Sequence, residues 1–206
     1  MTTTHLIRSL AVVGSALAGL VLTATAPVHA ELTHLQAAGD PSGDVLGLSG
    51  SSAAAGHAAP ARRLGDLTRV RVFHGPKRVT VTLTARRLER PTAGSFALLA
   101  TPLRTPSGDY FGGVMLGSRP AHDVAWIEGE STGDLTCPGL RYRLLPAESK
   151  VRVSIPRSCL KRPRWVRASG YVMYPGSSRS TDMYVDMLGS DPTAESFGAW
   201  TRRAWH

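Results

Sequence analysis

Two adjoining stretches with strict period-two alternation constrain the fold more than any other feature of the chain. In LTRVRVFH, residues 67–74, Val70 and Val72 alternate with Arg69 and Arg71. After the turn sequence GPK, the run RVTVTLTARRL begins at residue 78, and its valines and leucine alternate with threonines. Successive side chains of a strand point to opposite faces, so each run has one apolar face and one polar face. Together they predict a β-hairpin that buries one side.

Short strand-like runs continue over residues 94–188, separated by Gly, Pro, Ser or Asp. Regularly spaced short strands with turn signals are typical of sandwiches and barrels. We therefore predict an all-β fold, a single antiparallel β-sandwich of the jelly-roll or immunoglobulin-like kind. At most one short helical turn is expected, in PRSCLK, where Pro156 suits a first helical position. The basic and aromatic tail FGAWTRRAWH is expected to fray at its end.

The first thirty residues have the pattern of a secretory signal peptide. Arg8 precedes an apolar run from about Leu10 to Leu22, and the small-residue box VHA ends at Ala30. The apolar run is shorter than the roughly 20 residues that a membrane span requires. We expect cleavage near Ala30 and release of a secreted, soluble protein without a membrane span, which we expect to be a monomer.

The rest of the chain divides by composition into two parts. LGLSGSSAAAGHAAPA, residues 46–61, is rich in Gly, Ala and Ser and shows no periodicity, so residues 31–61 are predicted to be a flexible segment. Within it, residues 40–45 are predicted to be either a disordered leader or a short strand that pairs back onto the domain. Residues 62–206 are predicted to be the sandwich domain.

The two cysteines, Cys137 and Cys159, form an even pair 22 residues apart. In a secreted chain such a pair is expected to form a disulfide. In the chain-entropy description, closing a loop of this length stabilises the fold by about 3 kcal/mol.

The chain is strongly basic, with a net charge of +9. Residues 1–30 hold one basic and no acidic residue, so the remainder keeps about +8. This charge favours anionic partners; without a nucleic-acid-binding motif, we expect a polysaccharide or an anionic envelope polymer rather than nucleic acid. The densest basic stretch, a candidate surface for such a partner, consists of Lys161, Arg162, Arg164 and Arg167. Scattered solvated arginines are the alternative interpretation.

Three acidic residues gather near the start of the fold, in DPSGDV and RLGDL. Asp40, Asp44 and Asp66 carry hard oxygen ligands, and Gly43 permits the tight turn that a calcium site uses. If residues 40–45 lie beside the first long strand, the three carboxylates converge on one point. The alternative is that Asp40 and Asp44 are ordinary turn residues and Asp66 begins a strand.

The stretch DPSGD, a loop, then GDLTRVRVFHGPKRVTVTLTA is similar to the opening of the DOMON-like sandwiches, a group that includes carbohydrate-binding modules. The later stretch VRVSIPRSCLKRPRWVRASGYVMY resembles the end of small secreted actinobacterial proteins of uncharacterised function. The first resemblance implies a β-sandwich, a carbohydrate ligand and calcium at Asp40, Asp44 and Asp66.

Aromatic residues in the second half are candidates for a sugar-binding platform. In RWVRASGYVMY, read as one strand, Trp165 and Tyr171 share a face opposite Val166 and Val172. That face is either a platform or part of the core.

Catalytic signals are weak. Glu128 and Glu130 share a face of the strand VAWIEGE, and paired carboxylates are what glycoside hydrolysis requires. Same-strand acids two residues apart are also what a solvated face shows. No histidine pairing at metal spacing and no nucleophile elbow occurs in the sequence.

We therefore expect no enzyme, but a secreted binding or envelope-associated module for a glycan or anionic polymer. A small glycoside hydrolase and a purely structural extracellular protein are the alternatives.

Overall fold

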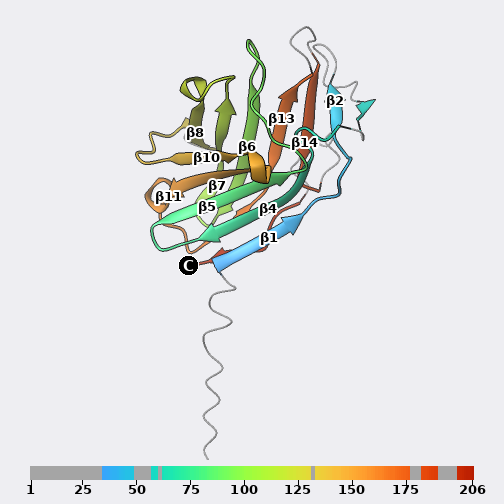
Figure 1. Cartoon of the computed structure of the whole chain (residues 1–206). Coiled ribbons are helices and arrows are strands. Elements are labelled where there is room, and N and C mark those ends of the chain that lie inside the picture. The colour runs from blue at the N-terminus through green and yellow to red at the C-terminus, as the bar shows by residue number, and fades with distance from the viewer. Residues whose placement is uncertain (1–33, 49–56, 60–61, 131–132, 177–181, 190–198) are drawn as a thin grey trace, which may run out of the picture.

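The computed structural model of the chain describes residues 34–48, 57–59, 62–130, 133–176, 182–189 and 199–206. These residues form two antiparallel β-sheets packed as a sandwich, so the predicted all-β fold class is confirmed. In Figure 1 the strands of the smaller sheet cross in front of those of the larger sheet. The predicted signal peptide, residues 1–30, lies outside the described residues, as do residues 49–56 of the Gly/Ala/Ser-rich run.

The smaller sheet has five strands. Their order is β1 (Leu35–Gly39), β4 (Leu67–His74), β5 (Arg78–Ala85), β11 (Lys150–Pro156) and β10 (Arg141–Leu145). The predicted hairpin is β4–β5, in which Val72 pairs with Val81. Each valine of the alternating runs is fully buried, and each arginine between them is exposed or half-buried. The period-two pattern thus sets which side of this sheet faces the core.

The larger sheet has ten strands. Its main order is β3 (His57–Ala58), β2 (Leu46–Leu48), β14 (Met183–Met187), β13 (Tyr171–Pro175), β6 (Ala97–Thr105), β7 (Gly108–Leu116), β8 (Val124–Gly129) and β9 (Gly133–Asp134). In addition, β12 (Trp165–Ala168) pairs with both β6 and β15 (Ala204–Trp205).

The core lies between the inner faces of the two sheets. The smaller sheet contributes aliphatic side chains from β4, β5 and β11, and the larger sheet contributes them from β6, β7, β8, β12 and β13. All of these are almost completely excluded from water: Val70, Val81, Val153, Ile155, Leu99, Leu103, Val114, Ile127, Val166 and Val172. Burial of apolar area on this scale is the main contribution that stabilises such a fold.

Of the two alternatives for residues 40–45, the short strand does not form, and these residues are a turn and a link between strands. Strands lie on either side of the range: β1 precedes it in the smaller sheet and β2 follows it in the larger one. Strand β1, LQAAG, lacks alternating apolar side chains and is ordered by backbone pairing with β4. Part of the segment predicted to be flexible therefore crosses between the sheets as ordered structure.

The described residues contain three 3-10 turns, whereas the sequence predicts at most one short helical turn. The predicted turn after Pro156 is η4 (Arg157–Leu160), and the others are η2 (Pro120–His122) and η3 (Pro146–Glu148). Both additional turns begin with proline, whose fixed φ suits the first position of a helical turn.

The stretch predicted as one strand over 164–174 is broken at Ser169 and Gly170 into β12 and β13, which both pair with β6. At Gly170 the two sheets approach so closely that a Cβ atom would lie 2.6 Å from Val70 Cγ2. Any larger residue would push the two sheets apart here.

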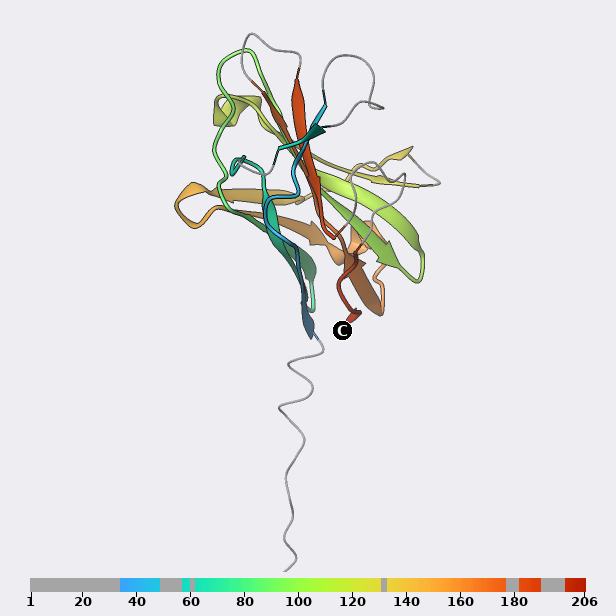
Figure 2. The ribbon, with the colours of Figure 1, turned by 90° about the vertical axis from the view of Figure 1, so that its right-hand side faces the viewer.

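The tail expected to fray is ordered at residues 199–206. Thr201 and Ala204 are fully buried, and the Ala168 N–H donates to Thr201 Oγ1 over 3.0 Å. Figure 2 shows the C-terminus beside the start of β1, where His34 Nδ1 lies 2.6 Å from the carbonyl oxygen of Trp205. Pairing with β12 thus holds the end of the chain in the sheet.

The predicted disulfide between Cys137 and Cys159 is confirmed. Cys137 precedes β10 and Cys159 lies in η4, so the bond joins the segment before an edge strand to the turn that follows its neighbour β11.

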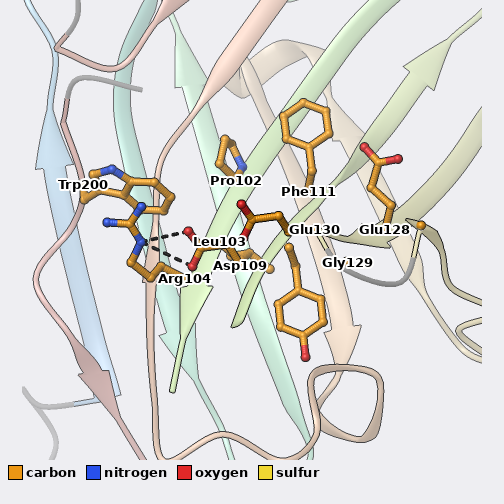
Figure 3. Close-up of a pocket in the computed structure, with 11 residues that line it drawn as sticks. Pro102, Leu103, Arg104, Asp109, Phe111, Glu128, Gly129, Glu130 and Trp200 are labelled. Carbon is orange, nitrogen blue, oxygen red and sulfur yellow. Dashed lines mark hydrogen bonds and ion pairs between the residues drawn. The ribbon is translucent and has the colours of Figure 1, made fainter. Parts of the chain in front are cut away.

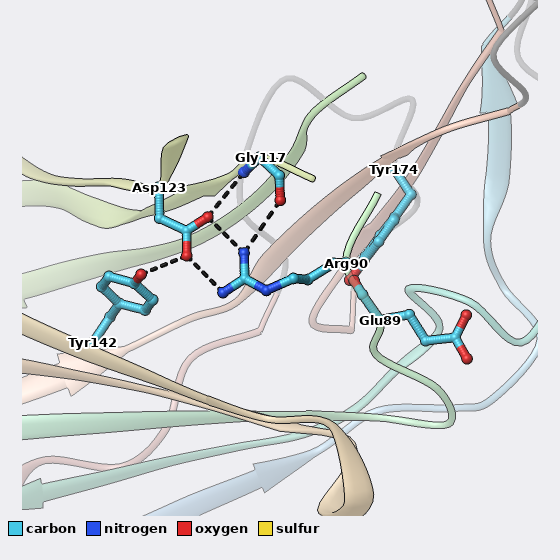
Figure 4. Close-up of polar contacts among 6 residues, drawn as sticks. All are labelled: Glu89, Arg90, Gly117, Asp123, Tyr142 and Tyr174. Atoms are coloured by element: carbon cyan, nitrogen blue, oxygen red, sulfur yellow. Dashed lines mark hydrogen bonds and ion pairs between the residues drawn. The ribbon is translucent and has the colours of Figure 1, made fainter. Parts of the chain in front are cut away.

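A polar cluster ties the long connection between β5 and β6 to both sheets (Figure 4). Arg90 of that connection donates two hydrogen bonds of 2.8 Å to Asp123, to which Tyr142 of β10 also donates. Nearby, the buried Tyr174 hydroxyl donates to the Glu89 carbonyl over 2.8 Å. Burial of Asp123 opposes its ionisation, but the hydrogen bonds from Arg90 and Tyr142 outweigh it and lower the pKa of this carboxyl. The cluster is therefore a satisfied structural network.

Candidate functional site

An acid cluster lies where the chain crosses from one sheet to the other. Asp40 and Asp44 stand in the link between β1 and β2, and Asp186 stands on β14 beside β2. Each residue places one carboxylate oxygen so that the three oxygens lie within 4.8 Å of one another. We call these three residues the acid cluster.

Each carboxylate of the acid cluster has one oxygen without a hydrogen-bond partner among the described residues. Asp186 Oδ2 accepts a hydrogen bond of 2.5 Å from the Leu67 N–H, and Asp40 Oδ1 accepts one from the Gly189 N–H. The second oxygens of these residues, together with Asp44 Oδ1, are buried and have no partner among the described residues. Unpaired buried carboxylate oxygens are costly, and they are the groups that a hard cation binds. The donor set therefore fits Ca²⁺ better than a transition metal.

The electrostatics of the acid cluster point the same way. Burial raises the pKa of Asp186 to about 8 and that of Asp40 to about 7, and the neighbouring carboxylates add to both shifts. Burial also raises the pKa of Asp44. These groups resist carrying three negative charges together, and a divalent cation would remove that resistance.

Asp66, the third residue predicted for the calcium site, stands beside the acid cluster and has other partners. It is fully buried, and its Oδ2 accepts hydrogen bonds from Arg86 over 3.0 Å and from the Gly43 N–H over 3.1 Å. Its Oδ1 has no partner among the described residues. Asp66 thus fixes the turn that carries Asp44, and its Oδ1 remains without a described partner beside the acid cluster.

The sequence reasoning missed Asp186 as a ligand, since it lies 146 residues after Asp40 in the chain. Its place in the acid cluster depends on the pairing of β14 with β2, which no local pattern predicts. The signal that could have found it is a charged residue in the otherwise apolar strand MYVDM.

A groove of about 480 Å³ lies on the outer face of the larger sheet, across β6, β7 and β8 (Figure 3). Pro102, Phe111 and Trp200 are among the residues that line it. Pro102 and Phe111 are paired across β6 and β7, and the Phe111 ring lies 6.2 Å from that of Trp126. We call this feature the aromatic groove.

Charged groups stand among the rings of the aromatic groove. Arg104 Nε donates to Asp109 over 3.0 Å, and the Arg104 guanidinium lies 4.6 Å from the centre of the Trp200 ring. Glu128 and Glu130 line the groove from β8 and the turn after it, as a shared strand face predicts. The groove thus offers ring faces, one guanidinium and three carboxylates on adjoining strands.

Trp165 and Tyr171, the predicted aromatic platform, do not form one surface. Trp165 on β12 pairs with Trp205 of β15, and the Arg203 guanidinium lies 4.6 Å from its ring centre. Tyr171 lies beyond the break at residues 169–170, on the outer face of β13, where its hydroxyl contacts Met173 Sδ over 3.5 Å. The two residues are six positions apart in the chain, which at the spacing of extended backbone corresponds to roughly 20 Å between them.

The predicted basic surface is also divided. Lys161, Arg162 and Arg167 line three different hollows. Arg167 Nε is engaged by the Thr201 carbonyl over 3.0 Å. Lys161 and Arg162 stand in the turn that ends η4, both with positive φ, whereas Arg167 lies on β12.

No family model, no curated protein and no solved structure matches this chain. In the described part of the chain, no helix has the length and apolar character needed to cross a membrane. Assignments of function must therefore come from the chemistry of these sites.

Proposed function

We propose that the chain is a secreted, non-catalytic module that binds a neutral glycan in the aromatic groove and is stabilised by calcium at the acid cluster. The observation that carries this proposal is the combination of Phe111 and Trp200 with several charged groups in one groove on a rigid sheet. Sites for small ligands typically join apolar walls with a few polar groups that orient the ligand.

The groove suits a sugar chain without charge. The flat C–H face of a sugar ring packs against aromatic rings such as Phe111, and its hydroxyl groups both donate and accept hydrogen bonds. Glu128, Glu130 and Asp109 accept from such hydroxyls, and Arg104 donates to them. Three carboxylates against one guanidinium also disfavour an anionic ligand in this groove.

Calcium has a supporting role in this proposal. The acid cluster joins the β1–β2 link to β14 and does not line the aromatic groove. Asp40, Asp44 and Asp186 would hold the ion, with the free oxygen of Asp66 at its border. The ion would neutralise the cluster and fasten the N-terminal strands to the larger sheet.

Affinity electrophoresis in native gels that contain hydroxyethylcellulose, xylan, glucomannan or laminarin tests the glycan proposal. The protein carries a net charge of +9, so it is run toward the cathode. We expect at least one polysaccharide to retard the wild type, and Trp200→Ala and Phe111→Ala to abolish the retardation. Phe73→Ala, which removes an exposed ring from the other sheet, is the matched control and should remain retarded.

Two results would contradict the glycan proposal. If no polysaccharide retards the protein, the purely structural role gains support. If both groove variants are retarded like the wild type, the glycan binds elsewhere.

The glycoside hydrolase remains a second candidate because Asp109 on β7 faces the same groove as Glu128 and Glu130. Paired carboxylates from different strands are what that reaction uses. Against it, Asp109 is already engaged in an ion pair with Arg104 over 3.0 Å. Release of reducing ends from the four polysaccharides by the wild type, abolished in Glu128→Gln, would support hydrolysis and overturn the non-catalytic proposal.

A further inference from the structure

The outer face of the smaller sheet is a dense array of cations. On β4, β5 and β11 these side chains alternate with buried valines, and on β10 they alternate with half-buried Tyr142 and Leu144. The cations of the four strands are Arg69, Arg71, Arg78, Arg141, Arg143, Lys150 and Arg152. None of the five strands of this sheet contains an aspartate or a glutamate. We call this surface the basic face.

The strand register places these cations in rows across the sheet. Arg71 lies opposite Thr82, Thr82 opposite Arg152, and Arg152 opposite Arg143. In the next row Arg69, Thr84 and Lys150 are aligned in the same way. From standard sheet spacings, cations two strands apart are about 10 Å from each other and cations of successive rows about 7 Å.

The arrangement is one that a sheet selected only for stability would avoid. Like charges directly opposite on neighbouring strands destabilise a sheet, and Arg143 and Arg152 are such a pair. Among the described residues, Lys150 is the one member of the basic face in an ion pair, with the exposed Glu148, whose carboxylate also interacts electrostatically with Arg143 and Arg152. Arg78 donates hydrogen bonds to Ser154 and to the Gly139 carbonyl. The other arginines of the basic face are directed outward and exposed.

The basic face is also hollowed. A depression of about 420 Å³ is lined by Arg69, Arg71, Lys150 and Arg152, and by the row of threonines on β5. At one end stand Phe73, which is 47% exposed, and Leu35, which is 36% exposed. The hollow therefore joins cations, hydroxyl groups and an aromatic ring.

We propose that the basic face is a second binding site, which holds an acidic polysaccharide bearing carboxylate or sulfate groups. Guanidinium groups bind such anions through paired hydrogen bonds. The threonine hydroxyls of β5 exchange hydrogen bonds with sugar hydroxyls, and the Phe73 ring packs on a sugar face. The aromatic groove lies on the outer face of the other sheet, so this inference stands independently of the neutral-glycan proposal.

The test compares binding of the full protein to immobilised polygalacturonate and heparin at 150 mM salt. We expect the double variant Arg71→Gln/Arg152→Gln to weaken binding at least about tenfold, as loss of one to two charge-assisted contacts implies. The control Arg119→Gln/Arg164→Gln removes the same charge from exposed residues outside the basic face and should weaken it less than about twofold. Equal losses in the two double variants would overturn the proposal, because net charge alone would then explain binding.

Two further probes separate sugar recognition from attraction of charge. Phe73→Ala should weaken binding to polygalacturonate but not to polyglutamate, which has carboxylates and no sugar rings. Tighter wild-type binding to polyglutamate or to double-stranded DNA than to both polysaccharides would overturn the assignment.

A variant of the aromatic groove tests where the acidic polymer binds. Trp200→Ala should bind polygalacturonate like the wild type; weaker binding by this variant would place the acidic polymer in the aromatic groove instead. Thermal unfolding of every variant confirms that it is folded.

Discussion

Asp186→Asn removes one negative charge from the acid cluster and preserves the oxygen that accepts the Leu67 N–H. Every pair of carboxylates in the cluster has oxygens within 4.8 Å, so each fully charged pair repels by about 3.5 kcal/mol at an effective dielectric constant of 20. Asp186 takes part in two such pairs. Burial raises its pKa to about 8, so the calcium-free protein near pH 7.5 relieves part of this repulsion by holding a proton.

We therefore expect Asp186→Asn to be more stable than the wild type in EDTA, by about 3 kcal/mol rather than the full two-pair repulsion. For a chain of this size that corresponds to a rise of about 6 to 12 °C in the unfolding midpoint. Calcium at 100 times its dissociation constant should stabilise the wild type by about 2.7 kcal/mol, or about 5 to 11 °C. The variant should lose most of that calcium-dependent rise.

Differential scanning calorimetry at pH 7.5, in millimolar calcium and in EDTA, measures both effects on one protein. Asp134→Asn is the matched control, because Asp134 is exposed on β9 and is not part of the acid cluster. It should change neither midpoint. The reasoning fails if Asp186→Asn lowers the midpoint in EDTA while it retains the full calcium shift, since the carboxylate would then be a structural acceptor alone.

Three further predictions concern stability in solution. Reduction of the Cys137–Cys159 bond should lower the free energy of unfolding by about 3 kcal/mol, measured by urea denaturation with and without reductant; an unchanged midpoint would contradict this. Asp123→Ala leaves the Arg90 guanidinium without its carboxylate and should cost about 3 kcal/mol in the same assay. Burial lowers the pKa of His74 to about 4, so the unfolded state gains a proton below about pH 6.5 while the folded state does not. The raised pKa values of Asp186 and Asp40 act in the opposite direction over this range, so the contribution of His74 is read as a difference between variants. Between pH 6.5 and 4 the wild type should lose about 3 kcal/mol of stability relative to His74→Gln, and none relative to the exposed His122→Gln.

The parts of the fold that the sequence predicts well are strands in which buried apolar residues alternate with outward residues. In β4 and β11 each buried valine is followed by an outward residue, so the strand limits and the buried face follow from neighbouring residues. The disulfide between Cys137 and Cys159 could be predicted because the sequence contains two cysteines, which can pair in only one way. Strand β1 was missed because LQAAG carries no such pattern and is fixed by its partner β4.

The sites depend on which strands become neighbours, and this is where local reasoning fails. Asp40 and Asp44 were predicted as ligands from their spacing, but Asp186 joins them through a pairing between distant strands. The densest run of basic residues in the sequence is divided by a turn, whereas Arg71 and Arg152, 81 residues apart, share one row of a sheet. Sequence density indicates a surface only when the chain stays straight.

The position of β2 in the larger sheet determines when the fold can be completed. This strand pairs on one side with β3 and on the other with β14, which begins at Met183. A chain made from its N-terminus has no β14 until residues 183–187 have been synthesised. Pairing of strands so far apart in the chain is slow, because the entropy cost of closing the loop arises before the contacts compensate it. Any fragment that ends before residue 183 would leave the β2 edge unpaired and prone to associate with other strands. The larger sheet is therefore completed only after β14 has been synthesised and can pair with β2.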